Sequence, residues 1–342
     1  MTSPADPLLQ AQAALAAGDL PAAEAALDRR LGAASRDVGA LLLKGMLRER
    51  AGDLRAAVSF YQAALAQDGA FGGLPPTLAP LADHARAAID RAQVEFAAHL
   101  AASIGPLPPR VQEAVELMRG ERQLYFQQPS VFYLPCLPQR RFYEVEEFDW
   151  LGSIVEKIPA MQAELAAVMA GGEDVFAPYV ERPENRPAPN NPLLEKPDWG
   201  AFYFWRDGEP VKDAAARCPV TMAALELAPM PRIPGRSPNA LWSRLKPGTH
   251  IGSHVGMLNS RLICHVPIRT APACTLRVGS ETRAWSDGVP LIFDDSIEHE
   301  ARNDGPEERV VLLFEIWRPE ITEEERAGIG SILAAIQSYG VG

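Results

Sequence analysis

The chain has 342 residues, of which 47% are hydrophobic and 23% charged, and its formal net charge is -11. This length can hold two domains with a core each, and the composition is that of a globular protein. The acidic balance argues against a nucleic-acid partner, because phosphate binding relies on Lys and Arg. No basic segment followed by an apolar core opens the sequence, and no apolar run reaches about eighteen residues, so we expect a cytoplasmic protein without a membrane anchor.

The first hundred residues contain a repeat. The motif Ala-Gly-Asp-Leu at 17–20 recurs at 51–54, a period of 34 residues that is typical of helix–turn–helix units in tetratricopeptide repeats. Gly45 and Tyr61 fall where the paired helices of such a unit pack closely, and a further helix over 78–102 would cap the array. We therefore expect a tetratricopeptide-like helical domain over residues 1–103. It either binds a peptide or protein partner or forms a helical shoulder that binds nothing.

A proline-rich stretch at 103–109 marks a domain boundary. A linker with one helix, over 104–129, is expected to lead into a second domain at 130–342. The beginning of that domain predicts one helix over 150–170 and a long loop over 171–198. Its cysteines lack CxxC spacing, so reduced, mostly buried thiols are expected rather than a zinc ribbon or disulfides.

Beyond Trp199 the sequence is typical of short strands. Runs rich in β-branched and aromatic residues are separated by turn residues and predict strands at 200–205, 240–245, 261–268, 275–278, 289–293 and 310–317. Such a series favours a jelly roll or a related double-sheet barrel, which can hold a small ligand between its sheets. His254 is expected just after one strand and His299 just before another. Trp199, Trp205 and Trp242 are expected in the core.

Four of the six histidines lie between Ser243 and Trp317. Imidazole ligands suit Fe, Zn, Cu and Ni, so the residue type alone does not choose a metal. In a two-His-one-carboxylate site an acid stands two residues after the first histidine, but here that position is Gly256. A site on His254 and His299 would leave open coordination positions, which favours redox chemistry over a closed structural zinc site. Arg309 could hold a carboxylate beside the metal.

These motifs carry a resemblance to a known family. The run SRLKPGTH at 243–250, HVG at 254–256, Asn259, Arg261 and His265, FDDSIEHE at 293–300, Arg309 and WRP at 317–319 resemble the aspartyl/asparaginyl β-hydroxylase family over roughly 132–320. The resemblance implies an α+β protein, with the helical repeats followed by a double-stranded β-helix of jelly-roll or cupin-like type. The segment at 130–135 resembles the family's entry strand, so a strand is expected there. It also implies a 2-oxoglutarate-dependent non-haem iron dioxygenase that uses Fe(II), 2-oxoglutarate and O2 to hydroxylate a C–H bond.

The resemblance also assigns roles to residues. It places the iron on His254 and His299, the distal carboxylate of 2-oxoglutarate on Arg309 and Ser243, and His265 near the metal-proximal end of 2-oxoglutarate. The implied target is the β-carbon of an Asp or Asn residue in a peptide or protein, or of a related small molecule. The animal members have Arg-x-Arg-x-His where this chain has Ile263 in place of the second arginine, which puts recognition of an acidic substrate in doubt.

Several alternatives stay open at this point. Arg261 either contacts the substrate or forms an ion pair inside the barrel. Asp294 and Asp295 could ligate the metal, orient an imidazole or brace the turn before His299. Two other functions are a non-catalytic scaffold with a degenerate barrel and a halogenase-like oxygenase that admits halide at the position opposite Gly256.

Overall fold

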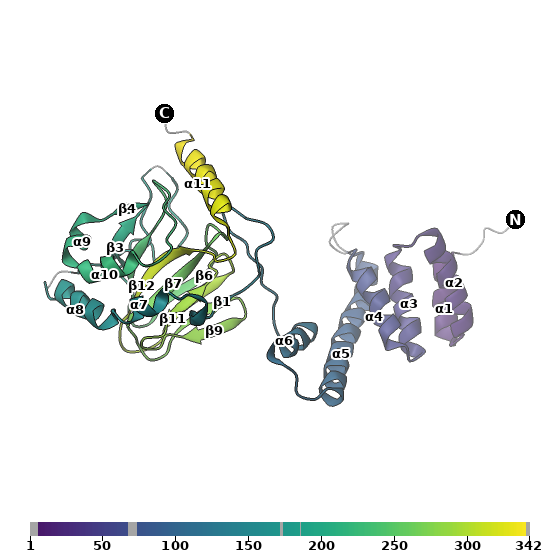
Figure 1. Ribbon diagram of the computed structural model, residues 1–342. Coiled ribbons are helices and arrows are strands. Elements are labelled where there is room, and N and C mark those ends of the chain that lie inside the picture. The colour runs from purple at the N-terminus through teal and green to yellow at the C-terminus, as the bar shows by residue number, and fades with distance from the viewer. Residues whose placement is uncertain (1–5, 68–73, 172–173, 185, 340–342) are drawn as a thin grey trace. The chain divides into compact units, whose positions relative to one another are not determined.

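The computed structural model describes residues 6–67, 74–171, 174–184 and 186–339 and divides the chain into two compact units, Met1–Arg122 and Gln123–Gly342 (Figure 1). The first unit is helical and the second is built from antiparallel strands, so the predicted order of a helical region followed by a sheet domain is confirmed. Within the described residues, no helix is both long enough and apolar enough to cross a membrane.

The first unit consists of consecutive helices, which are α1 (Pro7–Ala17), α2 (Leu20–Ala33), α3 (Val38–Arg50), α4 (Leu54–Leu65), the short η1 (Pro76–Leu78), α5 (Ala79–Ser103) and α6 (Pro109–Met118). The 34-residue period is also visible at the ends of these helices. Gly18 and Gly52 take left-handed φ values of 76° and 77°, and Asp19 and Asp53 accept capping hydrogen bonds at the starts of α2 and α4. The tetratricopeptide-like character of the unit stays a prediction.

Tight packing joins α3 to α4. Tyr61 of α4 is fully buried and its ring lies against Gly45 of α3, where a Cβ atom would overlap the ring. The Tyr61 hydroxyl donates to the Glu49 carboxylate at 2.7 Å, so the polar end of the buried side chain is satisfied. Glycine at this position therefore sets how closely the two helices approach.

The second unit begins with short elements. They are β1 (Phe142–Tyr143), η2 (Val145–Glu147), α7 (Leu151–Val155), α8 (Ile158–Met169) and β2 (Ala177–Pro178). The prediction of a single helix over 150–170 is wrong, because Pro159 lacks an N–H group and its ring conflicts with the carbonyl four residues earlier, at Val155, where α7 ends. The predicted strand over 130–135 is also wrong, since only an isolated bridge joins Phe132 to Leu258.

Two antiparallel sheets form the body of the second unit. The larger sheet has the order β1, β10 (Leu291–Phe293), β7 (Arg261–Arg269), β12 (Arg309–Trp317), β5 (Ala240–Leu245), β3 (Trp199–Arg206) and β2, with β4 (Glu209–Pro210) beside β3. The smaller sheet has the order β6 (Thr249–His254), β11 (His299–Asn303), β8 (Cys274–Val278) and β9 (Glu281–Ala284). The helices α9 (Lys212–Arg217), α10 (Pro219–Leu225) and α11 (Glu323–Ser338) complete the unit.

The six strands predicted beyond Trp199 are confirmed with shifts of one or two residues at their ends. The strands β6, β9 and β11 were not predicted. They are short and polar, and half of the smaller sheet's side chains face solvent, which leaves too few apolar residues to show a pattern. As a result His254 and His299 do not flank strands as expected, because His254 is the last residue of β6 and His299 the first of β11.

Each face of the larger sheet has its own core. On one face, Trp242 and Phe314 pack against helical residues such as Leu151 and Met161. On the other face, residues of both sheets pack together, among them Leu245, Ile251, Leu276 and Phe293. The larger sheet is therefore buried on both faces. The space between the two sheets also encloses polar residues.

The contact between Gly45 and Tyr61 can be tested by Gly45→Ala. The added methyl group would displace the buried ring, so we expect the free energy of unfolding to fall by about 1–3 kcal/mol. Gly32→Ala is the control, because Gly32 lies in α2 with open space around it and alanine is the better helix former. Denaturant unfolding followed by helical circular dichroism measures both. Equal stability of the two variants would contradict the packing described.

Candidate functional site

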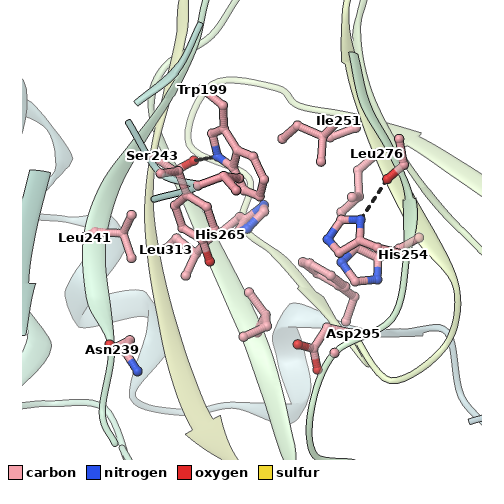
Figure 2. A pocket seen from close by; sticks show the side chains of 18 of the residues that line it. Trp199, Asn239, Leu241, Ser243, Ile251, His254, His265, Leu276, Asp295 and Leu313 are labelled. Atoms are coloured by element: carbon pink, nitrogen blue, oxygen red, sulfur yellow. Dashed lines mark hydrogen bonds between the residues drawn. The ribbon is translucent and has the colours of Figure 1, made fainter. Parts of the chain in front are cut away.

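A cavity of about 620 Å³ lies between the two sheets (Figure 2). This size is ordinary for a small-molecule site. Both sheets line the cavity, and all the site residues named from the sequence are among its walls: Ser243, His254, Arg261, His265, His299 and Arg309. Residues spread over 67 positions of the sequence are thus brought together by strand pairing.

His254 and His299 face each other across β6 and β11. The two residues are paired in the strand register, and their ring centroids lie 4.1 Å apart. The Nδ1 atom of His254 lies 2.8 Å from the Gly252 carbonyl oxygen, and Nδ1 of His299 lies 3.1 Å from that of Ile297. A ring that donates from Nδ1 keeps its lone pair on Nε2. Both imidazoles are therefore set to offer Nε2 to a metal ion.

The surroundings keep both rings neutral. Burial lowers the pKa of His299 to about 3, and the neighbouring His254 acts in the same direction. Burial also lowers the pKa of His254. Neutral imidazole is the form that binds metals. In the part of the chain that the structure describes, no group of three or more His, Cys, Asp or Glu side chains is arranged around a common point for a metal. The pair would thus contribute two ligands and leave other positions open.

Asp295 occupies the space beside Gly256. A Cβ atom on Gly256 would overlap the Asp295 carboxylate, and the Gly256 N–H donates to the Asp295 carbonyl oxygen at 2.6 Å. One carboxylate oxygen of Asp295 accepts from Arg261 at 3.1 Å, whereas Oδ1 is buried without a hydrogen-bond partner among the described residues. Burial raises the pKa of the Asp295 carboxyl to about 6.

Asp294 braces the turn that leads into β11. Its carboxylate lies 2.8 Å from the Arg318 guanidinium, and neither side chain is exposed. It also accepts hydrogen bonds from the backbone N–H and hydroxyl of Ser296 and from the Gln127 amide. The carboxylate is fully engaged by these partners, so the geometry favours the turn-bracing interpretation for Asp294 over metal ligation.

Arg309 is a buried cation without an acidic partner. Its side chain is 1% exposed, and no described carboxylate forms an ion pair with it. The guanidinium lies 4.7 Å from the centre of the Trp285 ring and contacts the Ser243 carbonyl oxygen at 3.5 Å. Burial lowers the pKa of Arg309 to about 10, so the group is still charged at neutral pH. A buried charge of this kind is costly unless it is paired, which points to an anionic ligand.

Two polar residues in the same cavity as Arg309, His265 and Ser243, also have hydrogen-bonding groups that could bind a ligand. Both ring nitrogens of His265 are buried without hydrogen-bond partners among the described residues, and burial holds the pKa of His265 well below its usual value. The Ser243 hydroxyl accepts from the Trp199 indole N–H at 3.2 Å, which leaves its own proton free to donate. Trp199 packs in the core as expected, but it also lines the cavity.

Arg261 lies between two carboxylates. It is 3.1 Å from Asp295 and 3.2 Å from Glu315, so the structure shows an ion pair inside the barrel. Burial opposes the charged guanidinium, but the two carboxylates outweigh it and raise the pKa of Arg261. Sequence reasoning missed Glu315. Its signal was a single acid in the otherwise apolar run VVLLFEIW at 310–317, which marks a buried charge that needs a partner.

Comparison with known proteins gives the same assignment as the motifs. Residues 156–319 match the family model described as Aspartyl/Asparaginyl beta-hydroxylase. The human Aspartyl/asparaginyl beta-hydroxylase is 33% identical over 168 residues, which cover 48% of this chain and 21% of the human protein. Aspartate beta-hydroxylase domain-containing protein 2 of Xenopus tropicalis is 29% identical over 217 residues, which cover 61% of this chain and 55% of that protein.

The match is thus partial in length, since the chain spans from about a fifth to about half of these relatives. Among solved structures, a predicted oxalate decarboxylase from Thermotoga maritima covers 35% of this chain and 81% of its own at 12% identity. Its TM-score is 0.23, a similarity too low to carry an argument. The sequence relatives carry the comparison, and the segment that holds the histidine pair and Arg309 is similar to the aspartyl/asparaginyl β-hydroxylase family.

Proposed function

We propose that the second unit is an Fe(II)- and 2-oxoglutarate-dependent dioxygenase. It hydroxylates an unactivated C–H bond at the β-carbon of an Asp or Asn residue in a peptide or protein, or of a related small molecule. The observation that carries the proposal is the buried Arg309, which has no counter-ion among the described residues and shares one cavity with two neutral imidazoles. The family match supports hydroxylation. The two sheets around the cavity support a double-stranded β-helix over 130–342.

The donor set fits a ferrous ion. His254 and His299 would hold it through Nε2, because Nδ1 of each ring is engaged by a backbone carbonyl. No cysteine is among the described residues that line the cavity, so the thiolates that would favour a structural zinc site are missing from this part of the chain. With iron and 2-oxoglutarate bound, the site would couple oxidative decarboxylation of 2-oxoglutarate by O2 to substrate hydroxylation.

The other end of the cavity fits the cosubstrate. Arg309 would pair with the distal carboxylate of 2-oxoglutarate, and the Ser243 hydroxyl would donate to the same group. His265, whose ring nitrogens have no hydrogen-bond partner in the described part of the chain, would lie near the metal-proximal end. The role of these residues is to bind and orient, while Trp199 and Phe293 in the cavity wall exclude water.

The arrangement beside Gly256 disfavours a halogenase. A halide would need the space that a carboxylate ligand leaves vacant, but the Asp295 carboxylate already fills the space next to Gly256. An anion placed there would be repelled by a buried acid. For the first unit, we propose that the helices over 1–103 provide a binding surface for a peptide or protein partner.

The metal and cosubstrate roles can be tested by anaerobic titration with Fe(II) and 2-oxoglutarate, followed through the visible charge-transfer band of the chelate. We expect the band in the wild type and its loss in His254→Ala and in His299→Ala. His250→Ala is the control, because His250 lies in the same strand, half exposed, and pairs with Glu300 outside the cavity. Absence of a band in the folded wild type would refute the proposed function.

Arg309→Met tests the cosubstrate site separately. The variant keeps the bulk of the side chain but loses a charge-assisted pair worth about 1.5–3 kcal/mol. We therefore expect the 2-oxoglutarate concentration at half-saturation of the band to rise by about tenfold to a hundredfold. The band itself should still form at high 2-oxoglutarate, because Arg309 does not hold the metal. An unchanged half-saturation would remove Arg309 from the cosubstrate site.

Gly256→Ala tests the close approach of Asp295. The methyl group would push the carboxylate away from Arg261, so we expect the free energy of unfolding to fall by about 1–3 kcal/mol. Gly252→Ala, in the preceding strand β6, meets no atom within 4 Å and should be close to neutral. Denaturant unfolding of both variants measures the difference. A stable Gly256→Ala protein would show that Asp295 is not confined at this position.

A further inference from the structure

The cavity has few charged groups to meet a substrate. Among its described lining residues, the ionised side chains are Arg261, Asp295, Arg309 and Glu315. Under the proposed function, Arg309 is taken by the distal carboxylate of 2-oxoglutarate. The second carboxylate of that cosubstrate would lie at the metal. Arg261 is then the one cation lining the described cavity that a substrate could reach.

Arg261 is not free to bind an anion. Its guanidinium is held by Asp295 at 3.1 Å and Glu315 at 3.2 Å, and all three side chains are nearly buried, with exposed fractions of 11%, 8% and 7%. Glu315 is itself fixed, since it accepts from the Ser237 hydroxyl at 2.7 Å and the Asn239 amide at 3.3 Å. Both carboxylates engage the Arg261 guanidinium, so this cation has no free side for a further anion. A substrate carboxylate would have to displace a buried partner or lie beside two like charges.

Part of the wall next to this group is aliphatic. Leu241, Ile263 and Leu313 line the cavity from the larger sheet, and the strand register pairs Leu313 with Leu241 and Glu315 with Ile263. These residues are buried or nearly so. They offer a carboxylate neither a counter-charge nor a hydrogen-bond donor in place of its lost water. An uncharged group would lose much less hydration free energy on entering the same space.

One polar atom that is left unsatisfied beside Arg261 is an acceptor. Asp295 Oδ1 is buried without a partner among the described residues, and Figure 2 shows its carboxylate on the histidine side of the cavity. Such an atom requires an N–H or O–H donor. A carboxamide N–H or a water molecule meets that need, whereas an ionised carboxylate has no proton to donate.

We infer that the substrate group bound beside the histidine pair is an uncharged carboxamide, as in an asparaginyl residue, and that the corresponding carboxylate is rejected. The inference rests on the proposed function and narrows its substrate class. The Arg261–Asp295–Glu315 group acts as the specificity determinant, because it neutralises the cation that an acidic substrate would require. Ile263 contributes by leaving the neighbouring wall uncharged.

The test compares two pools of short peptides with the same randomised flanks, one centred on Asn and one on Asp. Each pool is incubated with the full chain, Fe(II), 2-oxoglutarate and O2 at neutral pH, and the gain of one oxygen atom is measured by mass spectrometry. We expect at least tenfold more hydroxylation in the Asn pool. Equal or greater hydroxylation of the Asp pool would overturn the inference. So would a lack of hydroxylation in both pools when the chelate band is present, whereas a missing band refutes the proposed function itself.

Two variants probe the cause of the preference. Ile263→Arg adds a cation without an acidic partner to the wall and should shift hydroxylation toward the Asp pool by about tenfold or more. Glu315→Gln removes one carboxylate from Arg261 and should also shift hydroxylation toward the Asp pool. This second variant keeps the test valid if Ile263→Arg does not fold. Val289→Arg adds the same charge at an exposed site outside the cavity and should leave the preference unchanged. No shift in either folded cavity variant would overturn the assigned cause.

Discussion

The site depends on the register between β6 and β11. Pairing of His254 with His299 places two imidazoles 4.1 Å apart and turns both toward the larger sheet. A shift of one residue in either strand would point one histidine to the opposite face, because side chains alternate along a strand. The turn before β11 is therefore held on both sides, by the buried Asp294–Arg318 ion pair and by the contact of Asp295 with Gly256. The placement of His254 opposite His299 therefore depends on this turn.

Buried charge is distributed unevenly within the cavity. Arg261 has two acidic partners, Arg309 has none among the described residues, and Asp295 has one unpartnered oxygen. A protein selected for stability alone would pair or remove such groups, because unpaired buried charge is destabilising. Residues that break the rule in this way are expected at functional sites. The unpaired groups are also the ones that the proposed iron, 2-oxoglutarate and carboxamide would satisfy.

The sequence predicted the parts of the fold whose residues are apolar on both faces. The strands of the larger sheet are buried on both sides, so runs such as 240–245 and 310–317 are recognisable without their neighbours. The strands β6 and β11 have one solvent-facing side and carry many polar residues, so their pattern is weak. The helix break near Pro159 could have been predicted from the proline itself, but the apolar periodicity over 150–170 favoured one continuous helix. The Arg261–Asp295–Glu315 group could not be predicted, because its members come from separate strands and a turn.

The glycine after the first histidine has two consequences that share one cause. Gly256 removes a carboxylate from the position that would complete a three-residue metal site, and the space beside it is occupied by the carboxylate of Asp295. That carboxylate is turned toward Arg261, whose other partner is Glu315. The carboxylate nearest to Gly256 is thus engaged by an arginine, and that arginine has no free side for an acidic group. The proposed open coordination positions and the inferred preference for an uncharged substrate both depend on this arrangement.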